Sequence, residues 1–144
     1  MDKVQLTIAA FGVRLLALAS IPLIFAYYIS TSSTAHIPHI TQVTGKSFQS
    51  EIMEAKTPVV VVYSAKWCPA CSAYKPFIED ASKKYNAVVK FVTIDVDEEV
   101  QLSEKIDVIP TTVIYNKGLV TTDHIGAILD TDRLNKFIDE AIKK

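Results

Sequence analysis

The chain has few of the residues that mark specialised classes of protein. Its 144 residues include only two cysteines and three histidines, which are too few for a disulfide scaffold and limit any metal site. Basic and acidic residues nearly balance, at 15 and 16, and this balance argues against an electrostatic nucleic-acid binder. The length and the pattern also exclude a collagen, a coiled coil, a multi-span transporter and a repeat array.

The composition is instead that of one globular domain with an unusual N-terminus. Apolar residues make up 49% of the chain and charged residues 22%, near the averages of folded proteins, so the chain is not disordered. Residues 1–35 carry only Asp2, Lys3 and Arg14 as charges, whereas the remaining 109 residues carry 13 basic and 15 acidic side chains. The longer part is therefore expected to be an ordinary soluble domain, large enough to bury its own core.

The N-terminal segment is predicted to be a hydrophobic helix that directs the chain to a membrane. It is apolar from Val4 to Tyr28 with four polar exceptions. Its most apolar part, without charged residues, runs from Leu15 to Ile29 and is short for a hydrocarbon core of roughly 30 Å. One interpretation of residues 1–29 is a signal peptide, with Ser33-Thr34-Ala35 as the cleavage site. Another is an uncleaved signal anchor, despite the cost of placing Arg14 in the membrane. A buried soluble helix is a third interpretation.

The charges of this segment predict its orientation. Lys3 and Arg14 favour an N-terminus inside and a chain that lies outside from Ser30 onward. We expect a single-pass protein of the cytoplasmic membrane with its C-terminal domain outside, in a periplasm, or else a cleaved form secreted to the periplasm. Targeting to an organelle is the alternative. Residues 30–39 are small and polar and are predicted to be a linker.

After the linker, the hydrophobic pattern alternates between the periods of strands and helices. The run Val59–Tyr63 is unbroken and apolar, as is typical of a central strand buried on both faces. The predicted order is βαβαβαββα, an α/β domain in which helices cover both faces of a mixed sheet. Strands are predicted at Ile40–Val43, Val59–Tyr63, Val88–Ile94, Thr111–Tyr115 and Leu119–Asp123, and helices from Ser47, from Pro69, at Glu98–Lys105 and from about Thr131.

The segment Trp67-Cys68-Pro69-Ala70-Cys71 lies where the buried strand meets the following helix. Two cysteines three residues apart across a first helical turn can close a disulfide. The unpaired N–H groups and the dipole of the helix N-terminus favour a thiolate on Cys68 and lower its pKa from about 8.5. Pro69 suits the first helical position, where no N–H is needed. We predict that Cys68 is the nucleophile and that Cys71 resolves the mixed disulfide formed on it.

Further features make residues 40–144 resemble the thioredoxin family. They extend well beyond the two cysteines, and together they are specific for a fold and for dithiol chemistry. These features are Trp67 before the first cysteine, Pro76 five residues after the second, Ile94-Asp95 at a strand end, Ile109-Pro110-Thr111, the turn Asn116-Lys117-Gly118, and Gly126 before the last helix.

The resemblance implies a thioredoxin fold, with a central mixed sheet flanked by helices and a cis peptide bond before Pro110. In the family this proline's loop faces the active site. The backbone of the residue before the proline, here Ile109, pairs with an extended segment of the substrate. The resemblance implies a substrate-binding set of Ile109, Pro110, Thr111 and Gly126.

The resemblance also implies the partners and the redox group. Substrates would be proteins with disulfides or thiols, and the redox group would be the Cys68–Cys71 disulfide itself, with no cofactor and no metal. Pro69 and Ala70 would surround the reactive sulfur, and Trp67 would be a lid beside it, the alternative being a core residue. We expect a monomer that is recharged by a membrane electron donor.

The departures from the family pattern carry information. Thioredoxin has a buried Asp and a Lys at the positions that here read Val62 and Phe91. Both polar partners are missing together, so the two strands can pack an apolar pair without leaving a buried charge unpaired. The proton acceptor for Cys71 is then open: water, Lys66 or an acidic residue elsewhere are the candidates. Ser64 and the Pro69-Ala70 dipeptide also depart, and the pattern looks more like exported, specialised thioredoxin-like proteins.

The direction of electron flow has two opposing indications. Strong oxidases of this superfamily carry His just before the second cysteine, whereas this chain has Ala70, which favours a reductant. An exported location favours oxidation. An oxidase of the same fold is therefore one alternative, and a non-catalytic subunit that binds a partner at Ile109-Pro110 is another.

Simpler interpretations remain for individual residues. The two cysteines could form a purely structural disulfide. A zinc site needs about four ligands, and the spacing of His36, His39 and His124 from the cysteines matches no zinc motif. The acidic group of Asp95, Asp97, Glu98 and Glu99 is interpreted as a strand end followed by the first turn of a helix, in preference to a docking patch.

Overall fold

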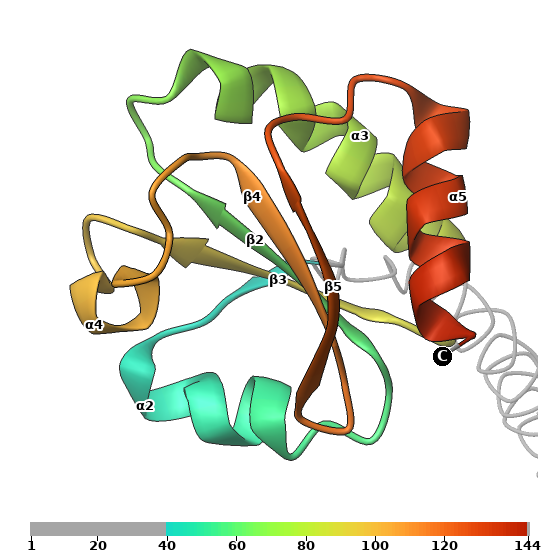
Figure 1. Ribbon diagram of the computed structural model, residues 1–144, viewed down its shortest axis with the longest axis horizontal. Helices are drawn as coiled ribbons and strands as arrows, with labels where there is room; N and C mark the ends of the chain where they lie inside the picture. The colour runs from blue at the N-terminus through green and yellow to red at the C-terminus, as the bar shows by residue number, and fades with distance from the viewer. Residues whose placement is uncertain (1–39, 144) are drawn as a thin grey trace, which may run out of the picture. The chain divides into compact units, whose positions relative to one another are not determined.

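The computed structural model describes residues 40–143. The chain runs through β1 (Ile40–Gln42), α2 (Gly45–Phe48), a π-helical turn η1 (Gln49–Met53), β2 (Val59–Ser64), α3 (Pro69–Tyr85), β3 (Lys90–Asp95), α4 (Val100–Ser103), β4 (Thr111–Asn116), β5 (Leu119–Ile125) and α5 (Thr131–Ile142). Figure 1 shows these elements around one sheet.

The sheet is mixed, as predicted. Its strand order is β1-β3-β2-β4-β5. The strands β1 and β2 both run parallel to β3, which lies between them, while β4 runs antiparallel to β2 and β5 antiparallel to β4. The strand β2 therefore lies at the centre, and its end, where the cysteine segment begins, is surrounded by other strands.

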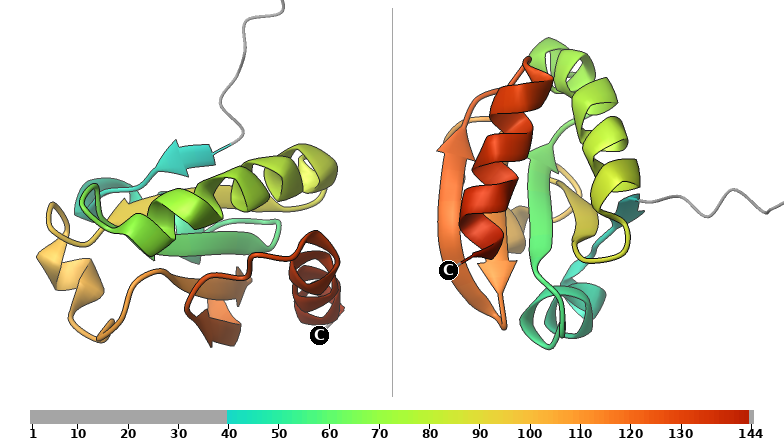
Figure 2. Two further views of the ribbon diagram at one scale, coloured as in Figure 1. Left: turned by 90° about the horizontal axis from the view of Figure 1, so that it is seen from above. Right: turned by 90° about the vertical axis from the view of Figure 1, so that its right-hand side faces the viewer.

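Helices cover both faces, which confirms the predicted layers. The helices α3 and α5 lie toward the upper right of Figure 1 and α2 and α4 toward the lower left. The right-hand view of Figure 2 is from the side on which α3 and α5 lie. Because successive strand residues point to opposite faces, Val60 and Val62 join the core under α3 and α5. Val59, Val61 and Tyr63 join the core on the other face, so the apolar run of β2 is buried throughout.

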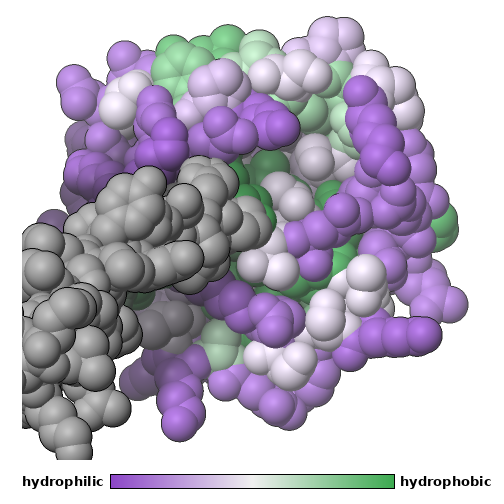
Figure 3. Space-filling view, turned by 180° about the vertical axis from the view of Figure 1, so that it is seen from behind, coloured by the Kyte–Doolittle hydropathy of each residue, from purple (hydrophilic) through white to green (hydrophobic). Residues whose placement is uncertain are grey.

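The face of the domain opposite to that of Figure 1 is mostly polar. Seen from behind, hydrophilic residues form most of the visible face, and apolar residues show mainly at its upper edge and in its middle (Figure 3). No helix within residues 40–143 has the length and apolar character that crossing a membrane requires. The predicted N-terminal hydrophobic helix and linker, with their boundaries, lie outside the described residues.

Several predicted boundaries were wrong by a few residues. The first helix begins at Gly45 and not at Ser47, because Ser47 is in the first turn, where its hydroxyl accepts the Thr44 backbone N–H at 3.0 Å. The second central strand begins at Lys90 and not at Val88, because the Val88 N–H is donated to the Tyr85 carbonyl in the turn that ends α3.

The bounds of α4 and of three strands also differ from the predicted ones. The helix expected at Glu98–Lys105 is only Val100–Ser103, because Glu99 before it has the non-helical dihedral angles φ −121° and ψ 58° and the Ile106 N–H is donated to the Ser103 carbonyl in the turn that follows. The hairpin strands extend to Asn116 and to Ile125, and the first strand ends at Gln42. The last helix begins at Thr131 as predicted, with the Asp130 carboxylate accepting the Arg133 N–H at 2.7 Å.

The hairpin turn between β4 and β5 packs against the end of η1. Lys117 and Gly118 both have positive φ, at 52° and 76°, which is the geometry of a tight two-residue hairpin turn. A Cβ at Gly118 would lie 2.6 Å from the Met53 carbonyl oxygen. Only glycine fits both the backbone conformation and this approach.

Replacing Gly118 by alanine is therefore expected to lower the free energy of unfolding. The left-handed conformation alone costs a non-glycine residue about 1–2 kcal/mol, and the contact with Met53 adds to this. Urea unfolding of the full chain measures the loss. Gly126→Ala is the matched control, because Gly126 also has positive φ but its added Cβ would meet nothing within 4 Å. An equal loss in the two variants would contradict the packing contact.

Candidate active site

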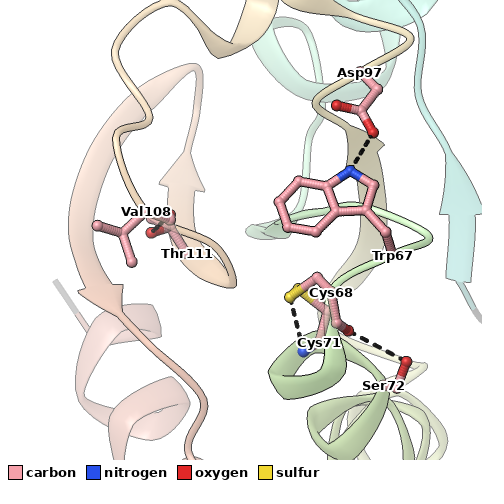
Figure 4. Close-up of a disulfide and its surroundings, with 7 residues drawn as sticks. All are labelled: Trp67, Cys68, Cys71, Ser72, Asp97, Val108 and Thr111. Atoms are coloured by element: carbon pink, nitrogen blue, oxygen red, sulfur yellow. Dashed lines mark hydrogen bonds between the residues drawn. A yellow bond between two sulfur atoms is a disulfide. The ribbon is translucent and has the colours of Figure 1, made fainter.

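The two cysteines lie at the start of α3. Cys68 is the residue that caps this helix, Pro69 is its first residue, and Cys71 follows in the first turn. The two sulfurs form a disulfide, shown at the helix end in Figure 4. Both cysteines are largely buried, at 4% and 8% exposed, so the site is recessed into the protein surface.

The first turn of α3 supplies one hydrogen bond to the Cys68 sulfur and another to the Cys68 carbonyl oxygen. The Cys71 backbone N–H donates to Cys68 Sγ at 3.1 Å, and the Ser72 hydroxyl donates to the Cys68 carbonyl oxygen at 3.3 Å. The first N–H groups of a helix have no partner within the helix, and the dipole adds positive potential there. When the disulfide is reduced, this arrangement favours negative charge on Cys68 over Cys71.

The loop before β4 lies beside the cysteines. The Ile109–Pro110 peptide bond is cis, as the resemblance implied, and Ile109 packs against a small buried cluster of Ala65, Cys68 and Cys71. The loop and the cysteines are 38 or more positions apart in the sequence. The folded sheet brings them together, because β2 and β4 are neighbours.

The other predicted substrate-binding residues hold this loop in place. The Gly126 N–H donates to the Pro110 carbonyl oxygen at 2.8 Å, and Gly126 has a φ of 95°. Thr111 is buried, and its hydroxyl donates to the Val108 carbonyl oxygen at 2.7 Å. Thr111 thus supports the loop from inside, while Val108 is exposed at its outer side (Figure 4).

Trp67 is not a core residue. Its side chain is 68% exposed, and its indole Nε1 donates to Asp97 Oδ2 at 2.7 Å. Figure 4 shows the ring next to the disulfide, turned toward Asp97 by this bond. Sequence reasoning missed Asp97 as a functional neighbour, because no spacing signal connects two residues 30 positions apart.

The acidic group after β3 connects the site to the rest of the domain. Asp95 Oδ1 accepts the Asp97 N–H at 3.0 Å, and Glu99 accepts the Gly45 N–H at 2.8 Å. Glu98 accepts from the Gln42 side chain at 2.8 Å and from Lys66. The interpretation of this group as a strand end is right for Asp95. Its interpretation as the first turn of a helix was wrong, because α4 begins at Val100 and has no acidic residue in its first turn.

Lys66 is not available as the proton acceptor for Cys71. Its hydrogen bond to Glu98 raises the pKa of Lys66, and the same bond lowers the pKa of Glu98. Lys66 therefore remains protonated, and its ammonium group is engaged on the surface. Val62 and Phe91 are both buried in the apolar core under α3, as their paired replacement predicted.

His124 does not approach the cysteines in a metal-binding arrangement. Its ring packs edge-on against Phe137, with centroids 5.8 Å apart. Across residues 40–143, no cluster of three or more His, Cys, Asp or Glu side chains is placed to hold a metal ion. His36 and His39 lie outside the described residues.

Comparison with known proteins agrees with this geometry. Residues 39–140 match the family model described as Thioredoxin. The chain belongs to the thioredoxin family. It is 34% identical to Thioredoxin C-2 of Corynebacterium nephridii over 72% of this chain and 96% of that protein, and 32% identical to thioredoxin of Pseudomonas aeruginosa over 72% and 97%. Mitochondrial thioredoxin of Mus musculus is 29% identical, over 78% of this chain and 72% of that protein.

Family membership and geometry together define the general activity. The protein is a thioredoxin-type thiol:disulfide oxidoreductase, and its redox group is its own Cys68–Cys71 disulfide. Like thioredoxins generally, it needs no separate cofactor for this chemistry.

The contact between Trp67 and Asp97 predicts a fluorescence change. Trp67 is the single tryptophan of the chain, so intrinsic fluorescence reports on it alone. Asp97→Ala removes the acceptor of the indole N–H, and the exposed ring is expected to move more freely. Steady-state anisotropy of the oxidised protein should fall. Asp107→Ala, which removes an exposed carboxylate from another loop, should leave it unchanged, and an unchanged value in Asp97→Ala would show that the bond does not hold the ring.

Proposed function

We propose that this protein reduces disulfides in other proteins outside the cytoplasmic membrane, to which its N-terminal segment attaches it. The observation that carries the chemical part is the position of Cys68 Sγ at the start of α3, where it accepts the Cys71 N–H at 3.1 Å. Cys68 is the nucleophile and Cys71 the resolving thiol.

The reaction is two successive thiol–disulfide exchanges. In the first, the Cys68 thiolate attacks one sulfur of a substrate disulfide, a new S–S bond joins Cys68 to the substrate, and the other substrate sulfur leaves as a thiolate that takes up a proton. In the second, Cys71 loses its proton and attacks Cys68 Sγ. The Cys68–Cys71 bond forms, and the second substrate sulfur leaves. The substrate gains two electrons, and the protein loses them.

The cis-proline loop is the proposed contact for the substrate. Ile109 packs against the buried cluster that contains Cys68, so a segment laid along the backbone of Ile109 would bring its disulfide close to the reactive sulfur. An extended segment bound through main-chain groups is compatible with many substrate sequences. Pro110, Thr111 and Gly126 keep this loop in its place beside the sulfur.

Features of the sequence support the proposed direction and location. Ala70 stands where strong oxidases carry His, so one source of thiolate stabilisation that makes a disulfide oxidising is missing. The apolar run before residue 30 supports membrane attachment, and Lys3 and Arg14 favour a domain that lies outside. A reductant outside the membrane needs a source of electrons, so we propose a membrane electron carrier as its donor.

The reduction potential tests the proposed direction. The full chain is equilibrated against glutathione and thioredoxin couples, and the reduced fraction is measured by thiol alkylation. We expect a value near about −270 mV, as for a reductant. A value near about −120 mV would identify an oxidase and overturn the proposed direction.

Mixed-disulfide trapping tests the roles of the two cysteines. Cys71→Ser removes the resolving thiol, so substrates should accumulate in disulfide linkage to Cys68 in cells. Cys68→Ser is the matched control and should trap far fewer. Both are read on non-reducing gels of alkylated lysates. Equal trapping by the two variants would contradict the assigned roles.

Location is tested on the same cells. Externally added protease should digest the domain of residues 40–144 in intact spheroplasts, and the domain should remain with the membrane fraction. The mass of the mature protein decides between an anchor and a cleaved signal. A domain protected from protease until the membrane is broken would overturn the proposed location.

A further inference from the structure

Two buried hydroxyl groups lie in the otherwise apolar core beneath α3. Tyr74 and Thr112 are 1% and 0% exposed, and Tyr74 Oη lies 3.2 Å from Thr112 Oγ1. Their surroundings include Val62, Phe91 and Ile114. A buried hydroxyl costs free energy unless it is hydrogen-bonded, and an apolar pair such as Phe and Val would avoid this cost. Neither hydroxyl takes part in the two thiol–disulfide exchanges.

The pair lies at the cysteine end of the helix. Tyr74 follows Cys71 by three positions, so the two side chains share one face of α3, and both are buried. Long side chains on a helix lean toward its N-terminus, which directs the Tyr74 ring toward the first turn. Thr112 is opposite Val62 in the register of β4 and β2. It comes two residues after Pro110 in the chain.

The resolving step creates a charge on Cys71, which is on the same face of α3 as Tyr74. Cys71 is 8% exposed, and its thiol must become a thiolate before it attacks Cys68. A thiolate next to an apolar core is unfavourable unless a donor hydrogen-bonds to it. Burial raises the pKa of Tyr74, so its hydroxyl keeps its proton and can serve as a donor.

The charged groups around this region are otherwise engaged. Lys66 is paired with Glu98 on the surface. Asp95, at the end of β3, accepts the Asp97 N–H. His124 on β5 is opposite Thr112 and packs against Phe137.

We propose that the Tyr74–Thr112 hydroxyl pair stabilises the Cys71 thiolate during the resolving step, with the Tyr74 hydroxyl as the donor and Thr112 as the residue that positions it. As Cys71 gives up its proton to water, the Tyr74 O–H donates to the sulfur, while the Thr112 hydroxyl donates to Tyr74 Oη. The thiolate attacks Cys68 Sγ, the Cys68–Cys71 bond forms, and the substrate sulfur leaves and takes up a proton. This inference depends on the dithiol activity alone, whatever its direction or location.

A two-phase reaction separates the two cysteines. The reduced full chain is mixed with dithiobis-nitrobenzoate, a disulfide that releases one coloured thiolate when Cys68 attacks and a second when Cys71 resolves. We expect Tyr74→Phe to slow the second phase about tenfold near neutral pH, the effect of losing one hydrogen bond to a charged group. The pH midpoint of that phase should rise by about one unit, and the first phase should be unchanged.

Tyr85→Phe is the matched control on the same helix. Tyr85 is also buried, but its hydroxyl donates to Asp139 at 2.9 Å at the far end of α3. This variant loses a buried tyrosine hydroxyl without touching the cysteines, so both phases should match the unmodified protein. A second phase that is equally fast in Tyr74→Phe and Tyr85→Phe would overturn the proposal.

Two variants at Thr112 test the same proposal even if Tyr74→Phe does not fold. Thr112→Ser keeps the hydroxyl and should keep the pH midpoint of the second phase, while Thr112→Val keeps the shape without the hydroxyl and should raise it. Equal midpoints in these two variants would also overturn the proposal. So would a midpoint that moves in His124→Gln but not in Tyr74→Phe, since the titrating group would then be His124. None of these outcomes bears on the reduction potential, which tests the direction of electron flow separately.

Discussion

A helix start leaves backbone N–H groups without partners, and in this protein a sulfur atom accepts one of them. Cys68 occupies the capping position of α3, which serine, threonine, asparagine or aspartate fills in most helices. The hydrogen bond from the Cys71 N–H to Cys68 Sγ caps the helix and at the same time favours negative charge on the sulfur. If α3 began one turn later, the sulfur would lose this donor, so the redox chemistry depends on where the helix begins.

The sheet determines where that helix start lies. Because β2 is the central strand and is buried on both faces, its end cannot shift without disturbing two cores. The antiparallel pairing of β2 with β4 then places the cis-proline loop next to the cysteines. Pro110 and Gly126 are joined by a backbone hydrogen bond, which extends this arrangement to β5. The disulfide at the start of α3 therefore lies next to the cis-proline loop, because the paired strands β2 and β4 adjoin these two segments.

Polar groups are distributed in an unusual way around the resolving thiol. The positions that hold a buried Asp and a Lys in thioredoxin hold Val62 and Phe91 here, so no ion pair is buried under α3 in the described domain. The ion pair nearest in sequence to the cysteines, Lys66 with Glu98, lies on the surface. Inside, the buried hydroxyls of Tyr74 and Thr112 bond to each other. Neutral hydroxyls cost less to bury than charges.

The sequence by itself determined the fold class, the order of the elements and the positions of the two cysteines, because each of these depends on local pattern: an unbroken apolar run, helical spacing, and a proline at the first helical position. Strand and helix ends were wrong by a few residues where a side chain or a turn took the hydrogen bond, as at Ser47 and Val88. Only the tertiary structure decided that Trp67 is exposed and bonded to Asp97, that Lys66 is paired, and that Tyr74 meets Thr112. These contacts join residues 30 or more positions apart, and the packing of strands and loops brings them together, which no local pattern records.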